Sequence, residues 1–202
     1  MMDASMQLSS DRQTTEQKTG FTVIELLIAA GILGILSSIA IPSYNAWLPK
    51  TRVNGAAREL FTELQLAKMK AISENNDYVI TFDSANNMYS IYDDDDNDFA
   101  TAGAECDELV KAIDIDNRHP GIEYGYVSGK SPSGSAITKA VTFSGSPRRV
   151  AFSPTGLANK NGSIYLVPTA DISHSRKDRQ RVITVLKTGR VRLYRHTGSS
   201  WE

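Results

Sequence analysis

The chain has 202 residues, a formal net charge of −1 and 41% hydrophobic residues. These values are typical of one globular domain with an appendage and exclude disorder along the whole chain. One cysteine, Cys106, and three scattered histidines exclude an internal disulfide and argue against a metal site rich in cysteine or histidine.

A polar leader, residues 1–20, precedes an apolar run, residues 21–41, in which Glu25 is the one charged residue. As an α-helix this run is about 32 Å long, enough to cross a hydrocarbon layer of about 30 Å. A core helix of a domain this small normally keeps a polar face, which the run lacks. We therefore predict a transmembrane helix over residues 21–41.

Glu25 needs a reason to be there, because a carboxylate inside a membrane costs about 2.5–3.5 kcal/mol. It lies four positions after Phe21, one helical turn away. If the chain is cut after Gly20, the new ammonium of Phe21 can pair with Glu25 of the same chain or of a neighbour. The alternative is that Glu25 reaches the lipid headgroups and has no partner.

The run from Lys18 to Leu27, KTGFTVIELL, resembles the class III prepilin signature of type IV pilins and type II secretion pseudopilins. The resemblance implies that a prepilin peptidase cleaves after Gly20 and that Phe21 is then N-methylated. It also implies that Glu25 guides docking of the subunit into a helical filament.

Residues 42–74 are predicted to form an amphipathic stem helix that ends near Ser73. Pro42 is expected to bend a continuous helix, and Pro49 is a second candidate break. Apolar residues recur at steps of three and four and are expected to pack on the sheet that follows; they are Val53, Ala56, Ala57, Leu60, Phe61, Leu64, Ala67, Ala71 and Ile72.

From residue 75 to residue 202 the hydrophobic period changes from 3.6 to 2, and turn residues separate short apolar runs. Nine strands are predicted, at residues 78–82, 88–92, 109–115, 122–127, 141–143, 150–152, 164–167, 182–186 and 190–194. The expected fold class is α+β, with a long N-terminal helix, transmembrane then amphipathic, packed on an antiparallel β-rich head.

The order of four segments in the head is similar to that in the GspH/FimT subgroup of pseudopilins and minor pilins. The segments are residues 89–92 (YSIY), 150–156 (VAFSPTG), 163–166 (SIYL) and 188–193 (TGRVRL). This resemblance implies a pilin-like fold and a minor component near the tip of a filament.

An acidic run between Asp93 and Asp116 contains ten carboxylates and one lysine. Alternate oxygens from Asp94, Asp96 and Asp98 form a weak candidate Ca²⁺ site. The run lacks the glycine and the distant glutamate of an EF-hand loop, so a solvated acidic loop without a cofactor is the main interpretation.

A basic run between His174 and His196 contains eight lysines and arginines and one aspartate. Its end, Gly-Arg-Val-Arg, is similar to the basic motif of FimT-type pilins that bind DNA, which makes Lys187, Arg190, Arg192 and Arg195 candidate DNA-binding residues. Two alternatives stay open: a plain final strand, or a basic segment that pairs with the acidic loop of its own chain or of a neighbour.

No catalytic constellation is present: the Gly-Ser pairs lack a nucleophile-elbow pattern, and Cys106 lies among acidic residues that disfavour its thiolate. We predict a non-enzymatic, single-pass protein of the bacterial inner membrane with a periplasmic head. Its expected partners are other pseudopilins or minor pilins, the prepilin peptidase and the inner-membrane assembly platform. The open alternatives are a secretion pseudopilus, a DNA-uptake pilus and an unrelated tethered β domain.

Overall fold

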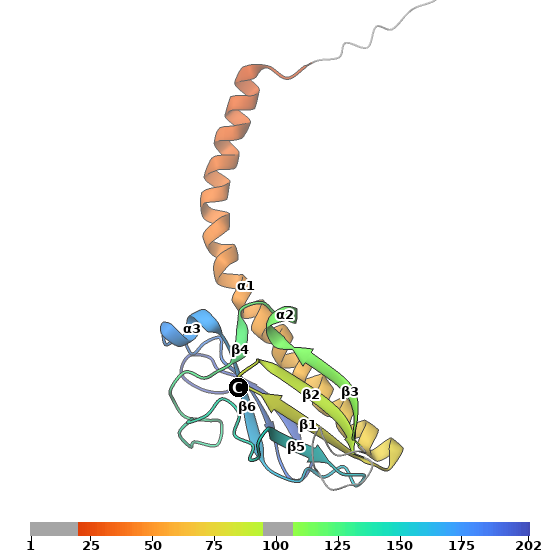
Figure 1. The fold of residues 1–202 in the computed structure, drawn as a ribbon. Helices are drawn as coiled ribbons and strands as arrows, with labels where there is room; N and C mark the ends of the chain where they lie inside the picture. The colour runs from red at the N-terminus through yellow and green to blue at the C-terminus, as the bar shows by residue number, and fades with distance from the viewer. Residues whose placement is uncertain (1–19, 95–106) are drawn as a thin grey trace, which may run out of the picture. The chain divides into compact units, whose positions relative to one another are not determined.

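The computed structural model describes residues 20–94 and 107–202, which fall into two compact units that meet between Ser43 and Tyr44 (Figure 1). The helix α1, Val23–Glu74, runs through this boundary for 52 residues. The predicted continuity at Pro42 is confirmed, and the candidate break at Pro49 is wrong. Near Pro42 the hydroxyls of Ser38 and Ser43 donate to the carbonyl oxygens of Ile35 and Ile39, at 2.7 and 3.2 Å.

The second unit contains two four-stranded antiparallel sheets (Figure 1). The first sheet has the order β3 (Asp107–Asp114), β2 (Met88–Asp94), β1 (Asp77–Asp83) and β5 (Arg148–Phe152). The second has the order β4 (Ile122–Tyr124), β6 (Gly162–Pro168), β7 (Arg181–Val185) and β8 (Val191–Arg195). Two short helices, α2 (Ile115–Arg118) and α3 (Thr169–Ser173), connect strands. The predicted α+β class is confirmed.

Eight of the nine predicted strands are present, and the prediction at residues 141–143 is wrong. Val141 makes only an isolated bridge to Ile164, beside the part of the β6 edge that β4 occupies. Val141 and Phe143 are nonetheless buried, and Thr142 between them is exposed. The apolar–polar–apolar pattern of residues 141–143 therefore belongs to a loop that inserts two side chains into the core. Such a loop has the same sequence period as a strand.

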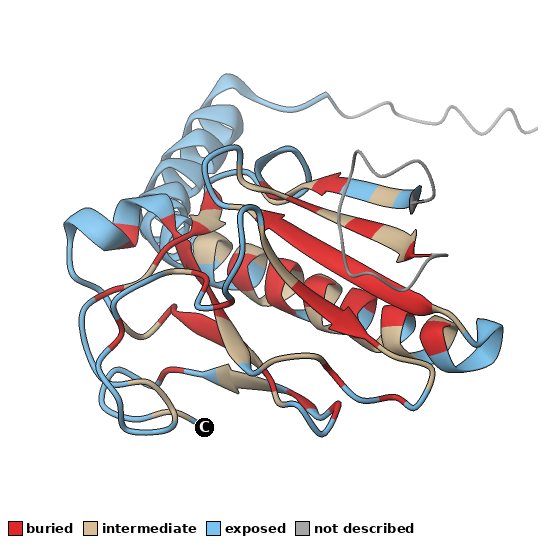
Figure 2. Ribbon diagram, turned by 60° about the horizontal axis from the view of Figure 1, so that its bottom comes forward, coloured by how far each residue is buried: buried red, intermediate tan, exposed pale blue. Residues whose placement is uncertain are grey.

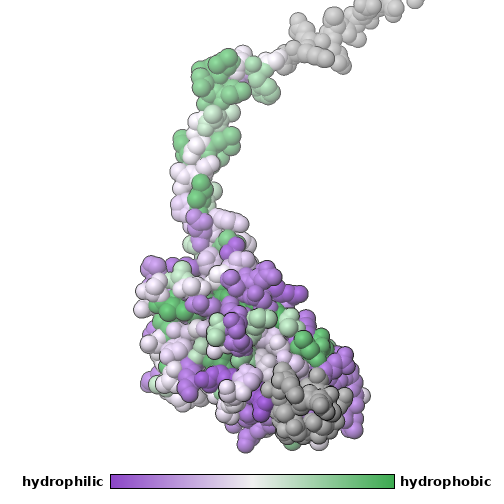
Figure 3. Space-filling model, in the orientation of Figure 1, coloured by the Kyte–Doolittle hydropathy of each residue, from purple (hydrophilic) through white to green (hydrophobic). Residues whose placement is uncertain are grey.

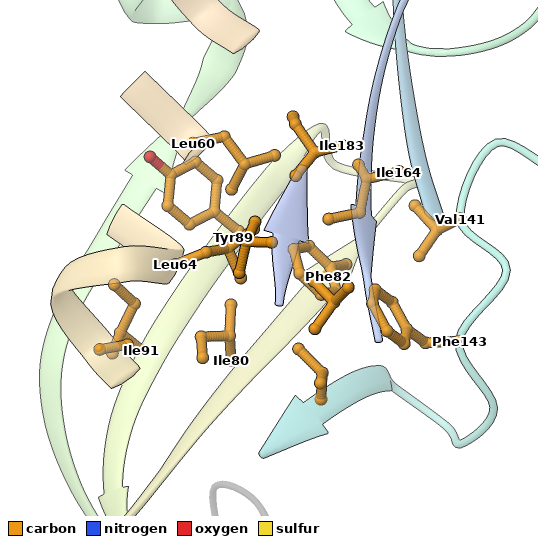
Figure 4. Packing of buried hydrophobic residues seen from close by; sticks show 14 of the residues in the cluster. Leu60, Leu64, Ile80, Phe82, Tyr89, Ile91, Val141, Phe143, Ile164 and Ile183 are labelled. Atoms are coloured by element: carbon orange, nitrogen blue, oxygen red, sulfur yellow. The ribbon is translucent and has the colours of Figure 1, made fainter. Parts of the chain in front are cut away.

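One hydrophobic cluster joins α1 to both sheets. Figure 2 shows the buried face of α1 against the strands, and Figure 4 shows Leu60 and Leu64 of α1 with Ile80 and Phe82 of β1 and Ile183 of β7. The stem's predicted partner is thus confirmed as the sheet domain. Two positions differ from the prediction: Ile72 is half exposed, and Phe61 is only partly buried.

The buried face of α1 also carries a charge. Glu63 is buried and forms an ion pair with Lys111 of β3. Because a buried carboxylate is costly unless a cation compensates it, this pair fixes β3 against the helix.

Candidate functional site

The start of α1 is a capping box formed by Thr22 and Glu25. The Thr22 backbone N–H and hydroxyl both donate to Glu25 Oε2, each at 2.8 Å, and the Glu25 N–H donates to Thr22 Oγ1 at 3.3 Å. This reciprocal bonding satisfies donors that a helix N-terminus leaves free, and it places the first helical residue at Val23. Glu25 therefore has partners within its own chain before any cleavage.

Gly20 and Phe21 lie just before the helix, in non-helical and exposed backbone. The helix begins at Val23, two residues after Phe21, so the Gly20–Phe21 peptide bond is outside the helical hydrogen-bond ladder. A peptide bond in this state can enter an extended protease cleft without first unwinding a helix. The arrangement is compatible with the predicted processing site at Gly20 and Phe21.

The apolar side chains that follow are exposed in the first unit, as the green surface of this segment in Figure 3 shows. Among the described residues, α1 is the one helix that is long and apolar enough to cross a membrane, by length and composition. Exposed apolar side chains in such a number need lipid or other protein around them.

The acidic run divides into strand residues and a segment outside the described residues. Asp93 and Asp94 belong to β2, where Asp93 accepts from Asn76 Nδ2 at 2.6 Å and from the Tyr78 hydroxyl at 3.0 Å. Asp94 is fully buried beside Asp77, whose pKa is raised by burial. The prediction of a solvated loop is therefore wrong for Asp94.

Two of the three candidate calcium ligands, Asp96 and Asp98, lie outside the described residues. Within residues 20–94 and 107–202 no group of three or more histidine, cysteine, aspartate or glutamate side chains is arranged to hold a metal ion. The calcium site on Asp94, Asp96 and Asp98 stays a prediction.

The four candidate DNA-binding residues do not share one face. Lys187, Arg190 and Arg192 are exposed at and after the β7–β8 turn, and the Arg192 Nη1 donates to the Tyr194 hydroxyl at 3.0 Å. Arg195 lies on the opposite face of β8, the face of the core residues Val191 and Leu193. Arg195 Nη2 is 2.8 Å from Glu202 Oε2, and the structure therefore separates it from the other three.

Two further arginines of the basic run, Arg176 and Arg179, are paired locally. Arg179 contacts Asp171 at 3.6 Å and Asp178 at 4.0 Å, and Arg176 contacts Asp178 at 3.6 Å. Across the part of the chain that the structure describes, the carboxylate partners of the run are Asp171, Asp178 and Glu202, and none belongs to the acidic run. The predicted pairing of the two runs within one chain is not found in these residues.

Two residues with a special role in the structure are absent from the sequence predictions. Thr22 is one, although the pattern Thr-x-x-Glu at positions 22–25 is the usual sequence sign of a capping box. Arg181 is the other: its side chain is buried, at 2% exposure, on the face of β7 where strand alternation also places Ile183 and Val185.

An apolar N-terminal helix, continued by an amphipathic helix on an antiparallel sheet domain, defines a pilin-like fold. Residues 56–189 match the family described as type II transport protein GspH, and residues 17–41 match the prokaryotic N-terminal methylation motif. The chain belongs to the GspH family.

Known fimbrial proteins are similar to this chain in sequence. A fimbrial protein of Pseudomonas aeruginosa is 34% identical over 122 residues, which are 60% of this chain and 75% of that protein. The type IV major fimbrial protein FimA of Dichelobacter nodosus is 51% identical over 35 residues, 17% of this chain and 22% of that protein.

Two solved structures are also similar. The type IV minor pilin FimU of Pseudomonas aeruginosa has a TM-score of 0.47 at 16% identity, covering 73% of this chain and 91% of that one. The minor pseudopilin EpsH of the Vibrio cholerae type 2 secretion system has a TM-score of 0.44 at 12% identity, covering 71% and 97%.

Proposed function

We propose that this chain is the precursor of a minor filament subunit, held in the bacterial inner membrane by residues 21–41 with its head in the periplasm. The observation that carries the proposal is the capping box, which leaves Gly20 and Phe21 outside the helix directly before an exposed apolar segment. A prepilin peptidase removes residues 1–20 on the cytoplasmic side, and Phe21 becomes the methylated N-terminus.

The apolar helix then moves from lipid into the core of a filament, among the helices of other pilins or pseudopilins. Lipid and packed helices are similarly apolar, so the hydrophobic effect contributes little to this step, and polar contacts and packing must favour it. Glu25 supplies such a contact, because its carboxylate can accept the Phe21 ammonium of a neighbour. The assembly platform of the inner membrane is the expected site of this exchange.

We expect Glu25→Gln to leave the protein in the membrane and cleaved, but to reduce its incorporation into filaments severely. Glutamine still completes a capping box, so the helix start is kept, whereas the negative charge that pairs with an ammonium is lost. The measurement is the fraction of the chain that co-purifies with sheared filaments, compared with its fraction in the membrane.

Thr22→Val is the matched control, because it removes the capping hydroxyl and keeps the Glu25 charge. Loss of a cap costs about 1 kcal/mol of helix stability, which the long helix can tolerate. Incorporation is therefore expected to be largely preserved in Thr22→Val. The reverse result, normal incorporation of Glu25→Gln and loss in Thr22→Val, would assign Glu25 a capping role alone.

The filament we favour is a type II secretion pseudopilus, in line with the description of the family. Deletion of the gene is then expected to abolish export of secreted enzymes and to leave surface pili in place. Loss of pili with normal export would assign the chain to a pilus, for which the fimbrial relatives provide the precedent.

DNA binding for uptake is the second candidate function, favoured by Lys187, Arg190 and Arg192. These cations are exposed near one another in the chain and have no carboxylate partner within the described residues. Duplex DNA presents one phosphate per strand about every 3.4 Å along its axis, and arginines on alternate positions of a strand, about 6.6–6.8 Å apart, match every second phosphate.

If this second function holds, Arg190→Gln with Arg192→Gln reduces the slope of log affinity against log salt by about 2 in a DNA mobility assay. Arg195→Gln serves as the control, because Arg195 lies on the other face and is paired with Glu202. Equal affinity of the double variant and the unaltered protein would end the DNA assignment.

A further inference from the structure

The unusual feature of the head is a buried arginine without an ion pair. Arg181, the first residue of β7, has 2% of its surface exposed. Its Nε donates to Asn54 Oδ1 at 2.7 Å, and its Nη1 donates to the Gln180 carbonyl oxygen at 2.8 Å. Its Nη2 has no hydrogen-bond partner, and no carboxylate lies within ion-pair distance of the guanidinium among the described residues.

Leaving a guanidinium in this state is costly, because a buried charge loses its hydration and normally gains a partner in return. The pKa of Arg181 is lowered to about 10, first by burial and then by the nearby charge of Arg195. At neutral pH the group is nevertheless charged. A permanent buried cation with an unused N–H group is arranged to accept an anion.

Arg181 lines a hollow of about 220 Å³ between α1 and β8. Besides Arg181, the wall includes Asn54 and Arg58 from α1, Leu193 and Arg195 from β8, and Glu202. Three guanidinium groups thus face one side-chain carboxylate. Arg58 is exposed and has no ion pair in the described part of the chain, so its charge is available to the hollow.

The size of the hollow restricts what can bind. Sites for drug-sized organic ligands range from about 300 to 1,000 Å³, so this one is too small for them. It is several times the roughly 30 Å³ that one water occupies, which suits a single small oxyanion or one acidic side chain. Arginine forks bind carboxylates through two parallel N–H bonds, and the exposed guanidinium of Arg58 provides such donors beside the buried charge of Arg181.

We propose that this hollow binds a carboxylate, the side chain of an aspartate or glutamate from a neighbouring subunit of the filament. The choice of partner rests on the proposed function: the hollow borders α1, and α1 is the element through which filament subunits would pack. Glu202, which is more than half exposed and bonded only to Arg195 in the hollow, acts as a displaceable internal competitor.

The first experiment tests the site without a filament. The full chain, purified in detergent, is titrated with glutarate, which carries the carboxylate of a glutamate side chain, and with chloride at equal ionic strength. We expect glutarate to raise the melting temperature more than chloride does. Arg58→Gln is expected to weaken the apparent glutarate affinity about tenfold, and Glu202→Gln to strengthen it.

Arg192→Gln is the matched control, since it removes an exposed arginine on the opposite face of β8, and its glutarate response should equal that of the unaltered chain. Arg181→Met removes the buried positive charge beside the hollow and should also lose most of the response. Equal shifts with glutarate and chloride, or an unchanged response in Arg58→Gln, would overturn the site.

The second experiment tests the partner. Arg58→Glu should reduce incorporation into filaments at least severalfold, with cleavage after Gly20 unaffected. If glutarate binds but Arg58→Glu is incorporated normally, the site holds a free anion and the subunit assignment is overturned. If the unaltered chain is absent from filaments while glutarate still binds, the proposed function fails and the carboxylate site stands.

Discussion

Replacement of Gly20 with tryptophan is expected to abolish processing, so that residues 1–20 stay attached and Phe21 is not methylated. The residue before the cut must fit a peptidase cleft together with the extended chain, and an indole is the largest change available there. Intact mass measurement of the membrane-extracted protein should show about 2 kDa of additional leader. Filament incorporation should fall with processing, because no free ammonium is produced.

The structure makes this experiment interpretable. A Cβ atom built on Gly20 meets no atom within 4 Å, so the first atom of a new side chain has free space among the described residues. Loss of processing would therefore arise in the complex with the peptidase and not from misfolding. Gly34→Ala, inside α1 with equally open surroundings, is the control and should be processed normally. Release of a chain that begins at Phe21 from the tryptophan variant would contradict the assignment of the cut site.

Phe82→Ala is expected to destabilise the head by about 3–5 kcal/mol, the range for removal of a large buried aromatic side chain. Phe82 of β1 is 1% exposed; its ring stacks on Phe143 with centroids 5.5 Å apart and meets Tyr124 edge to face at 6.3 Å (Figure 4). Since the average domain has only about 5–15 kcal/mol of stability, this one change should remove a large part of it.

The measurement is urea unfolding of a fragment of residues 44–202, which contains every residue of the buried hydrophobic clusters. Leu109→Ala is the control, because Leu109 of β3 is 53% exposed, and its effect should stay within about 0.5 kcal/mol. Similar losses for the two variants would show that the contact between β1 and the loop of Phe143 does not form the core.

The helix α1 is predictable from sequence because its signals are local. A long apolar run and a three- to four-residue period define it, and its backbone hydrogen bonds join residues only four apart in the chain. The effect of Pro49 is harder to predict. The sequence shows that Pro49 lacks an N–H, but not whether the surrounding residues let the helix continue through it, as it does.

The head shows where such signals end. The alternation at Val141 and Phe143 reports burial correctly but cannot tell a strand from a loop that lies on a core. The burial of Glu63 and Arg181 depends on partners far away in the chain, at Lys111 and Asn54. Arg195 is different: strand alternation already places it with Val191 and Leu193, and a strict count by twos would have separated it from Arg192.

The hydrophobic cluster that α1 shares with both sheets has a consequence for how the head changes over evolution and under stress. Both sheets contribute to this cluster, and the second sheet carries a smaller cluster of Ile137, Tyr165 and Val182 besides. Neither sheet can therefore melt, be swapped between proteins or be trimmed without exposing apolar side chains of the other. Heating should accordingly give a single cooperative calorimetric transition. A change of side-chain volume on the inner face of one sheet therefore requires a complementary change in the side chains of the other sheet that pack on α1. Loops at the rim of the sheets are free of this constraint.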